Sequence, residues 1–169
     1  MSRSPLEIRR TVESDWADVR ALRLEMLEDT PMAYGETLET ASQRGEAWWR
    51  MRAARGSSPE QMQLVAIRDG EWLGTMGGYV PDSATGPVLV GVYVVPRARG
   101  ARSGVTDALL AAVEDWAAER AGTLSLIVHE DNLRARAAYA KRGFVPTGHT
   151  IPYILNADER ELEMRKPLG

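Results

Sequence analysis

A basic, glycine-punctuated loop is the stretch of this sequence whose residue types could bind an anion. Residues 97–104 read R-A-R-G-A-R-S-G; they follow an apolar stretch that stops at Pro96, and a helical pattern begins at Val105. Backbone N–H groups of such a loop can surround a phosphate, while the N-terminus of the next helix adds a partial positive charge. We therefore predict a phosphate-binding loop here, although the same letters also fit an ordinary strand-to-helix connection with solvated arginines.

A second motif follows at residues 132–144, which read N-L-R-A-R-A-A-Y-A-K-R-G-F. Together with V-Y-V-V-P at residues 92–96 and the basic loop, it resembles the acetyl-CoA-binding core of the GNAT N-acetyltransferases. In that family a V-x-V-x-P strand end precedes an R-G-x-G-type loop and a later N-x-x-A-x-x-x-Y-x-x-x-G-F segment. The later segment matches position for position. The loop has two more residues between Gly100 and Gly104 than the commonest form, and Thr106 stands where glycine or alanine is usual.

Coenzyme A is the phosphate carrier that this resemblance implies. The sequence has neither the G-x-G-x-x-G of a dinucleotide-binding loop nor the G-K-[ST] of a P-loop. The pyrophosphate of coenzyme A accepts hydrogen bonds from N–H groups. Its ribose phosphate offers a partner to Arg99, Arg102 or Arg142, and the sequence does not decide which. The positions that the resemblance assigns to the acetyl-CoA site are Val92, Tyr93, Val94, Arg99, Gly100, Arg102, Ser103, Gly104, Val105, Thr106, Asn132, Ala135 and Arg142.

Tyr139 is the residue to which the resemblance gives a catalytic role. The matching tyrosine of GNAT enzymes points at the thioester sulfur, where a phenol can protonate the departing thiolate. From its spacing alone, Tyr139 is better explained as a core tyrosine near Ala135 and Phe144 whose hydroxyl has a partner. Asn132 also has two interpretations, as a helix N-cap on local grounds and as a contact to the coenzyme A arm by resemblance. Both of its roles can hold.

The resemblance also implies how transfer proceeds. The backbone at residues 92–94 should diverge from the strand predicted at residues 124–128 and leave N–H and C=O groups free for the pantetheine arm. The N–H of Val94 is then placed to stabilise the oxyanion formed when a substrate amine attacks the acetyl carbonyl directly in a ternary complex. A covalent enzyme intermediate is not expected, because the chain has no cysteine and no serine in a G-x-S-x-G motif.

No general base is assigned from the sequence. An amine with a pKa of about 10 must lose a proton before attack, so a carboxylate, a histidine or a water chain is expected nearby. The strand predicted at residues 88–95 lacks the glutamate that many family members carry there. Acidic groups near the mouth of the site would favour a cationic amine. The residues considered as bases, for each of which a solvated surface role is the better explanation, are Glu36, Asp82, His129 and Glu130.

Composition predicts one cytoplasmic domain. With 169 residues, of which 44% are hydrophobic, the chain can bury one good core but not two, so we expect a single domain over residues 1–169. A net charge of −3 argues against nucleic acid and membrane surfaces as partners, and no signal peptide or membrane-spanning run is evident. Without cysteine and with only two histidines, a metal site is not expected.

Hydrophobic periodicity predicts an α/β fold. Asp69-Gly70 is expected to form a hairpin turn and Gly77-Gly78 a bulge. The predicted order matches the GNAT fold, a mixed, mostly antiparallel sheet of about seven strands with helices on both faces. Strands are predicted at residues 6–10, 62–68, 72–80, 88–95, 124–128, 144–148 and 161–165, and helices at residues 14–27, 38–55, between the basic loop and Gly122, and 132–142.

The acceptor is expected to be an amine on a small molecule, bound between the 31–36 loop, the 79–82 turn and the segment around residues 149–154. Two alternatives stay open on sequence grounds. The same fold could act on a protein N-terminus or lysine, for which a long open groove is needed. The chain could also be a non-catalytic sensor of coenzyme A, which the missing strand glutamate favours and Tyr139 disfavours. A homodimer is compatible with the sequence, which does not decide the oligomeric state.

Overall fold

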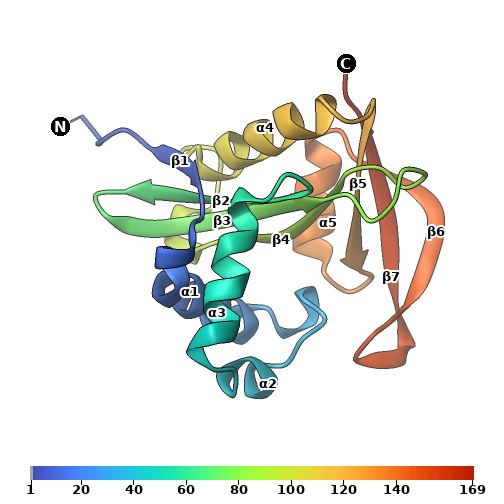
Figure 1. Ribbon diagram of the computed structural model, residues 1–169. Helices are drawn as coiled ribbons and strands as arrows, with labels where there is room; N and C mark the ends of the chain where they lie inside the picture. The colour runs from blue at the N-terminus through green and yellow to red at the C-terminus, as the bar shows by residue number, and fades with distance from the viewer. Residues whose placement is uncertain (1) are drawn as a thin grey trace.

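The computed structural model describes residues 2–169 as a seven-stranded mixed sheet with helices on both faces (Figure 1). The strands lie in the order β1-β2-β3-β4-β5-β7-β6, and every neighbouring pair is antiparallel except β4 and β5. The predicted fold class is therefore confirmed. The strands are β1 (Glu7–Arg10), β2 (Gln61–Arg68), β3 (Glu71–Tyr79), β4 (Val88–Val94), β5 (Thr123–His129), β6 (Val145–Tyr153) and β7 (Asn156–Pro167).

Five α-helices lie within the described residues, one more than the sequence predicts. The helix expected over residues 38–55 is two helices, because the first stops at Ser42 and Gly45 takes an extended conformation (φ −80°, ψ 170°) as the N-cap of the second. None of the helices in the described chain is both long and apolar enough to span a membrane. The helices are α1 (Trp16–Asp29), α2 (Leu38–Ser42), α3 (Glu46–Ala54), α4 (Val105–Ala118) and α5 (Leu133–Lys141).

The sheet has a different helical cover on each face. Helix α4 lies on one face and helices α1, α2 and α3 on the other (Figure 1). Side chains alternate along a strand, so successive residues of β3 face different layers. Gly78 faces α4, since a Cβ built there would come 2.7 Å from the Trp116 ring. Thr75 and Gly77 instead line a pocket together with residues of α1 and α3.

Where β3 and β4 pair, the bulge is in β4 and not at Gly77-Gly78 of β3 as the sequence suggested. Thr75 is paired with Tyr93, and Gly77 with Val90, so β4 has one residue more than β3 over this stretch. Gly91 takes the left-handed conformation (φ 58°) that such an insertion requires. The glycine at position 78, expected at the bulge, is needed for the close approach of α4.

Strands β4 and β5 part soon after they meet. Only two residue pairs join them, Val88 with Ser125 and Leu89 with Leu126. Beyond Leu89 the two strands diverge, while β5 goes on to pair with β7 along its whole length. The predicted divergence at residues 92–94 is therefore present. It leaves a gap in the middle of an otherwise continuous sheet.

Candidate active site

The backbone of β4 presents donor groups to the gap between β4 and β5. The N–H of Val95 donates to the carbonyl of Leu73 on β3 at 2.9 Å, so Tyr93, two residues earlier, also turns its backbone groups towards β3. By alternation, the backbone groups of Val92 and Val94 face the gap. No β5 residue is paired with either of them. Their N–H groups consequently face the gap, which is where the sequence analysis expects an amide-bearing arm and an oxyanion.

The carbonyl groups on the same side of β4 are not free, in contrast to the expectation. The Val92 carbonyl accepts a hydrogen bond from the Tyr34 hydroxyl at 2.9 Å. The Val94 carbonyl accepts one from Nε of Arg99 at 2.8 Å. Each carbonyl oxygen keeps a second lone pair, so a further donor can still bind, but the protein itself fixes where both groups point.

The basic loop is shaped by its own hydrogen bonds before α4 begins. The Ser103 hydroxyl donates to the carbonyls of Ala98 and Gly100, and accepts from the N–H of Val105 at 3.3 Å. Gly100 and Gly104 take left-handed conformations, with φ of 98° and 73°. Val105 is completely buried, so any contact that it makes with a ligand is through its backbone. The loop therefore ends in a fixed turn that leads into the N-terminus of α4.

Of the three arginines expected near the phosphates, Arg99, Arg102 and Arg142, two already have acidic partners. Arg99 contacts Asp29 at 2.7 Å, and Nε of Arg142 contacts Asp107 at 2.8 Å. Both arginines are bound to backbone carbonyls as well. Arg102 is exposed and takes part in no ion pair with any residue from 2 to 169. Of the three, it is the guanidinium group that folding leaves available to a phosphate.

Tyr139 lies against the edge of the core, with its ring 5.7 Å from that of Phe144 in an edge-to-face contact. Burial raises the pKa of Tyr139, and the neighbouring Tyr34 acts in the same direction. The phenol therefore stays protonated and can donate a proton. On the same helix, Oδ1 of Asn132 accepts from the N–H of Ala135 at 3.3 Å, which confirms the N-cap role of Asn132.

Two of the residues considered as bases are bound to other groups. Glu36 contacts Arg23 at 2.9 Å and Arg44 at 3.1 Å. Burial raises the pKa of Glu36, but the combined effect of the two guanidinium groups is larger and opposite, so the net shift of the pKa is downwards. Asp82 accepts hydrogen bonds from the backbone and hydroxyl of Thr85, and these contacts lower its pKa. Both groups are consequently weak bases.

The other two residues considered as bases, His129 and Glu130 at the end of β5, also form hydrogen bonds within the protein. Nδ1 of His129 accepts from the N–H of Asp131 at 3.1 Å, so the ring proton is on Nε2, which lies 3.0 Å from Glu159. Glu130 accepts from the N–H of Arg160 at 3.1 Å. His129, Asp131 and Glu159 have ligand atoms within 4.8 Å of one another, but both nitrogens of the imidazole are already bonded within the protein.

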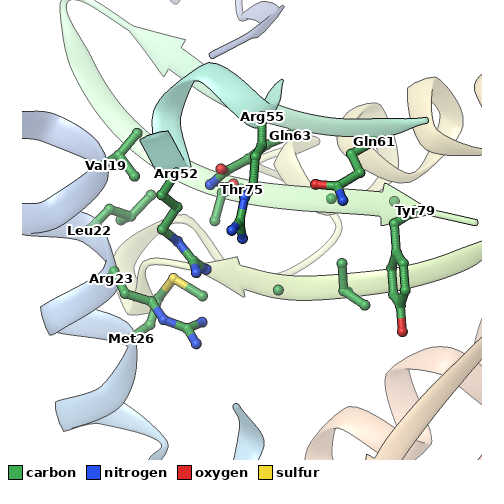
Figure 2. Close-up of a pocket in the computed structure, with 14 residues that line it drawn as sticks. Val19, Leu22, Arg23, Met26, Arg52, Arg55, Gln61, Gln63, Thr75 and Tyr79 are labelled. Carbon is green, nitrogen blue, oxygen red and sulfur yellow. Dashed lines mark hydrogen bonds between the residues drawn. The ribbon is translucent and has the colours of Figure 1, made fainter. Parts of the chain in front are cut away.

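A pocket of about 310 Å³ lies on the α1 and α3 face of strands β2, β3 and β4 (Figure 2). Leu22 and Met26 form an apolar side of it, and Val90 and Gly91 bring it to the bulge of β4 just before the gap. Sequence reasoning did not identify this pocket, although polar residues alternating on strands that helices cover were a visible signal. Its polar lining includes Arg23, Arg52, Arg55, Gln61, Gln63 and Thr75.

A second cavity, of about 380 Å³, adjoins the first, since Arg23 and Arg52 line both. It also contains Tyr34, Glu36 and Trp48, and the tip of the β6–β7 hairpin reaches it through Leu155. Of the predicted acceptor edges, residues 34–36 and Tyr79 line a cavity, whereas the hairpin does so only through Leu155, one residue beyond the predicted segment 149–154. Neither His149 nor Asp82 lines either cavity.

Residues 19–144 match the model of the acetyltransferase (GNAT) family. The chain belongs to this family. It is 32% identical over 151 residues to the mycothiol acetyltransferase of Beutenbergia cavernae, a match that covers 73% of the chain and 50% of that protein. The chain thus spans about half the length of this curated relative. The resemblance inferred from the motifs at residues 92–104 and 132–144 is confirmed.

Solved structures share the fold over nearly the whole chain. A GNAT acetyltransferase of Streptococcus pneumoniae superimposes with a TM-score of 0.77 at 22% identity, and the match covers 98% of this chain and 100% of the other. YncA of Salmonella typhimurium, solved with acetyl-CoA, gives a TM-score of 0.71 at 19% identity, with 98% and 95% covered. At these identities the likeness concerns the fold alone.

Proposed function

We propose that the chain is an N-acetyltransferase that moves the acetyl group of acetyl-CoA to the amine of a small molecule in a ternary complex. The observation that carries the proposal is the gap between β4 and β5, into which the backbone of Val92 and Val94 faces. Membership of the GNAT family and the acetyl-CoA in YncA support the choice of donor.

The residues around the gap fit coenzyme A. Amides of the pantetheine arm can pair with the N–H groups of Val92 and Val94, which have no strand partner on β5. The loop that ends at Gly104 leads into the N-terminus of α4, where a pyrophosphate is favoured by N–H groups and by the helix dipole. Arg102 is the guanidinium available for a phosphate.

The transfer step follows from these positions. The amine nitrogen attacks the thioester carbonyl, and a C–N bond forms while negative charge develops on the oxygen. The N–H of Val94 stabilises that charge because it is fixed in place before the reaction. The C–S bond then breaks, and Tyr139, whose raised pKa keeps it protonated, gives its proton to the thiolate. No side chain is assigned to accept the amine proton, so it passes to water, and the Tyr139 phenolate takes a proton back from solvent to complete the cycle.

A thiol-release assay tests the proposal. Free coenzyme A is measured with a panel of amines and peptides, for the native chain and for Tyr139→Phe in parallel. Tyr139→Phe is expected to lose about tenfold or more in rate, or at least about 1.4 kcal/mol of transition-state stabilisation, with unchanged affinity for coenzyme A. Equal rates for the two proteins would remove Tyr139 from the mechanism.

The same assay separates the two alternatives. The two pockets of about 310 and 380 Å³ have the size of a small-molecule site, which supports a small acceptor over a protein segment. Faster release with peptides than with any small amine would reverse that preference. Binding of acetyl-CoA without release on the whole panel would instead favour a sensor of coenzyme A.

A further inference from the structure

The floor of the 310 Å³ pocket is polar where a helix-covered sheet face is normally apolar. Gln61 and Gln63 alternate on β2, and Thr75 and Gly77 alternate on β3, so all four line the pocket on the same face. The amide of Gln63 donates to the Thr75 hydroxyl at 3.3 Å, and that hydroxyl donates to the carbonyl of Leu64 at 2.7 Å. Packing against α1 and α3 does not require these polar groups, which suggests that they serve a ligand.

Three guanidinium groups point into this pocket from the helical side. Figure 2 shows Arg23 from α1, Arg52 from α3 and Arg55 just after α3 directed into the space above the strands. Arg23 is neutralised by Glu36, but that carboxylate is shared with Arg44. Among the described residues no carboxylate pairs with Arg52 or Arg55. The pocket therefore has an excess of positive charge.

Arg52 is the unusual member of this group because it is largely buried without an anionic partner. Its Nε is fully buried and has no hydrogen-bond partner within residues 2–169. Its favourable neighbours are the Trp48 ring, 5.5 Å from the guanidinium carbon, and the Glu36 carboxylate, which raises the pKa of Arg52 but forms no ion pair with it. Burial, together with Arg23, Arg55 and Arg44, lowers the pKa of Arg52 to about 10, so it is still charged at neutral pH. A buried, unpaired charge is costly unless a ligand completes the site.

The pocket also has the right position for an acceptor. Val90 and Gly91 line it, and the next residue of β4 is Val92, whose backbone faces the gap. A compact molecule held at Arg52 by one end can therefore extend towards the place where the acetyl group is expected. The acidic groups that the sequence suggested near the acceptor do not border the space between Arg52 and the gap. Glu36 is bound by two arginines, and neither Asp82 nor Glu130 lines the pocket.

We infer that the acceptor is a compact amine whose other end is an anionic oxyacid group, a carboxylate or a phosphonate, bound by Arg52 and Arg55 over the Gln63 and Thr75 side chains. The planar guanidinium group pairs well with such oxygens, and burial strengthens the pairing. The inference rests on the proposed function and reverses the expectation of a purely cationic amine. Arg52 and Arg55 are binding residues and take no part in proton transfer.

Matched acceptors test the inference through thiol release. Each amino acid of a panel is compared with its own amide and with its aminophosphonate analogue, so that only the oxyacid group changes. The native chain is expected to prefer the acid over the amide by about tenfold or more in kcat/KM, equivalent to about 1.4 kcal/mol. The amine of the amide is less basic, so a larger fraction of it is unprotonated and able to attack at neutral pH. This difference favours the amide, so any observed preference for the acid is an underestimate of the effect of the oxyacid group. The phosphonate arm shows which oxyacid the pocket prefers.

Substitutions locate the preference. Arg52→Gln is expected to reduce the acid-to-amide ratio to about one through a raised KM for the acid, whereas Arg52→Lys should keep part of it. Arg50→Gln is the matched control, because Arg50 lies on the same helix but pairs with Glu46 on its exposed side. A ratio that survives in a folded Arg52→Gln, judged by its melting curve, would overturn the inference.

A binding measurement without turnover separates the two hypotheses. Calorimetric titration with acid and amide, in the absence of acetyl-CoA, is expected to show binding of the acid alone, lost in Arg52→Gln. Such binding without any thiol release would support the pocket and count against the transferase. Release that is equally fast with acid and amide, or faster with the decarboxylated amine, would support the transferase and overturn the anionic acceptor.

Discussion

The hydroxyl of Tyr34 donates a 2.9 Å hydrogen bond to the carbonyl of Val92, and it thereby ties the loop after α1 to the edge of the gap between β4 and β5. Burial raises the pKa of Tyr34, so this donor stays protonated throughout the physiological range. Tyr34 consequently links the second cavity, which it lines, to the backbone of β4 at the gap. Tyr34 contacts both hydrophobic clusters of the core, so it is held from its apolar side as well.

Tyr34→Phe should therefore loosen this connection without emptying the space that the ring fills. We expect a loss of about 1 kcal/mol in the free energy of unfolding, which is the usual contribution of one such hydrogen bond. The KM for the acceptor should rise several-fold, because residues 34–36 line the second cavity. Urea unfolding and steady-state kinetics measure the two effects. Tyr79→Phe, whose exposed hydroxyl forms no bond within residues 2–169, is the stability control and should unfold like the native chain.

Arg102→Gln should weaken the binding of acetyl-CoA. A charge-assisted hydrogen bond to a phosphate contributes about 1.5 kcal/mol or more, so we expect KM for the donor to rise about tenfold with little change in kcat. Arg68→Gln, a change at an arginine far along β2 that contacts the Ser4 carbonyl, should leave both constants unchanged. An unchanged KM for Arg102→Gln beside a raised one for Arg142→Gln would show that the Asp107 ion pair opens for the ligand.

Gly104→Ala should affect both stability and donor binding. Its φ of 73° is unfavourable for alanine by about 1 kcal/mol, while asparagine tolerates this conformation better. We therefore expect Gly104→Ala to unfold at lower urea and to show a raised KM for acetyl-CoA, with Gly104→Asn between it and the native chain. No atom lies within 4 Å of an added Cβ, so a steric clash does not confuse the comparison.

Glu36→Gln should lower stability in a pH-dependent way. The net pKa of Glu36 is below its ordinary value of 4.5, so the folded state prefers the ionised carboxylate. This contribution is present above the unfolded-state pKa and disappears as pH falls through the lower folded-state value. We expect Glu36→Gln to cost about 2 kcal/mol at pH 7 and progressively less below pH of about 4. Denaturant titrations at several pH values measure this, and a constant difference would contradict the role of ionisation.

Gly78→Ala should be strongly destabilising, because the added methyl group would come 2.7 Å from the buried Trp116 ring. Overpacking of this kind costs about 1–3 kcal/mol. Gly45→Ala provides the comparison, since position 45 has no neighbour within 4 Å and an ordinary negative φ. Melting temperatures of the two variants are sufficient, and equal temperatures would show that α4 can shift away from β3.

Local sequence signals were sufficient for the elements that carry the proposed donor site. Pro96, the glycines of the basic loop and the Asn132 cap determine local backbone, and each acts within a few residues of itself. The tip of the last hairpin was misplaced by comparison. The last two strands were predicted at residues 144–148 and 161–165, but β6 continues to Tyr153 and β7 begins already at Asn156. Ile154 and Leu155 are apolar residues at a turn, and polar turn chemistry is what the prediction relied on.

The pocket proposed for the acceptor could not be assembled from the sequence because its parts meet only in the tertiary fold. Arg52 is on α3 and Thr75 on β3, and nothing local indicates that they share a cavity. The pairing of Arg99 with Asp29, 70 residues apart, is equally invisible in one dimension. For the same reason Arg99 and Arg142 could not be distinguished from Arg102. Partners distant in the chain decided which charges are available to a ligand.

The narrow junction between β4 and β5 gives the sheet two halves that differ in how they are held. Strands β1–β4 form one antiparallel unit and β5–β7 another, and just two residue pairs join the units through the sheet. A donor lying in the gap would bridge both units and act as an additional cross-strand contact. Coenzyme A should accordingly raise the melting temperature, as any ligand of the folded state does, and should slow amide exchange in β5 more than in β2. On this view the substrate completes the sheet that binds it.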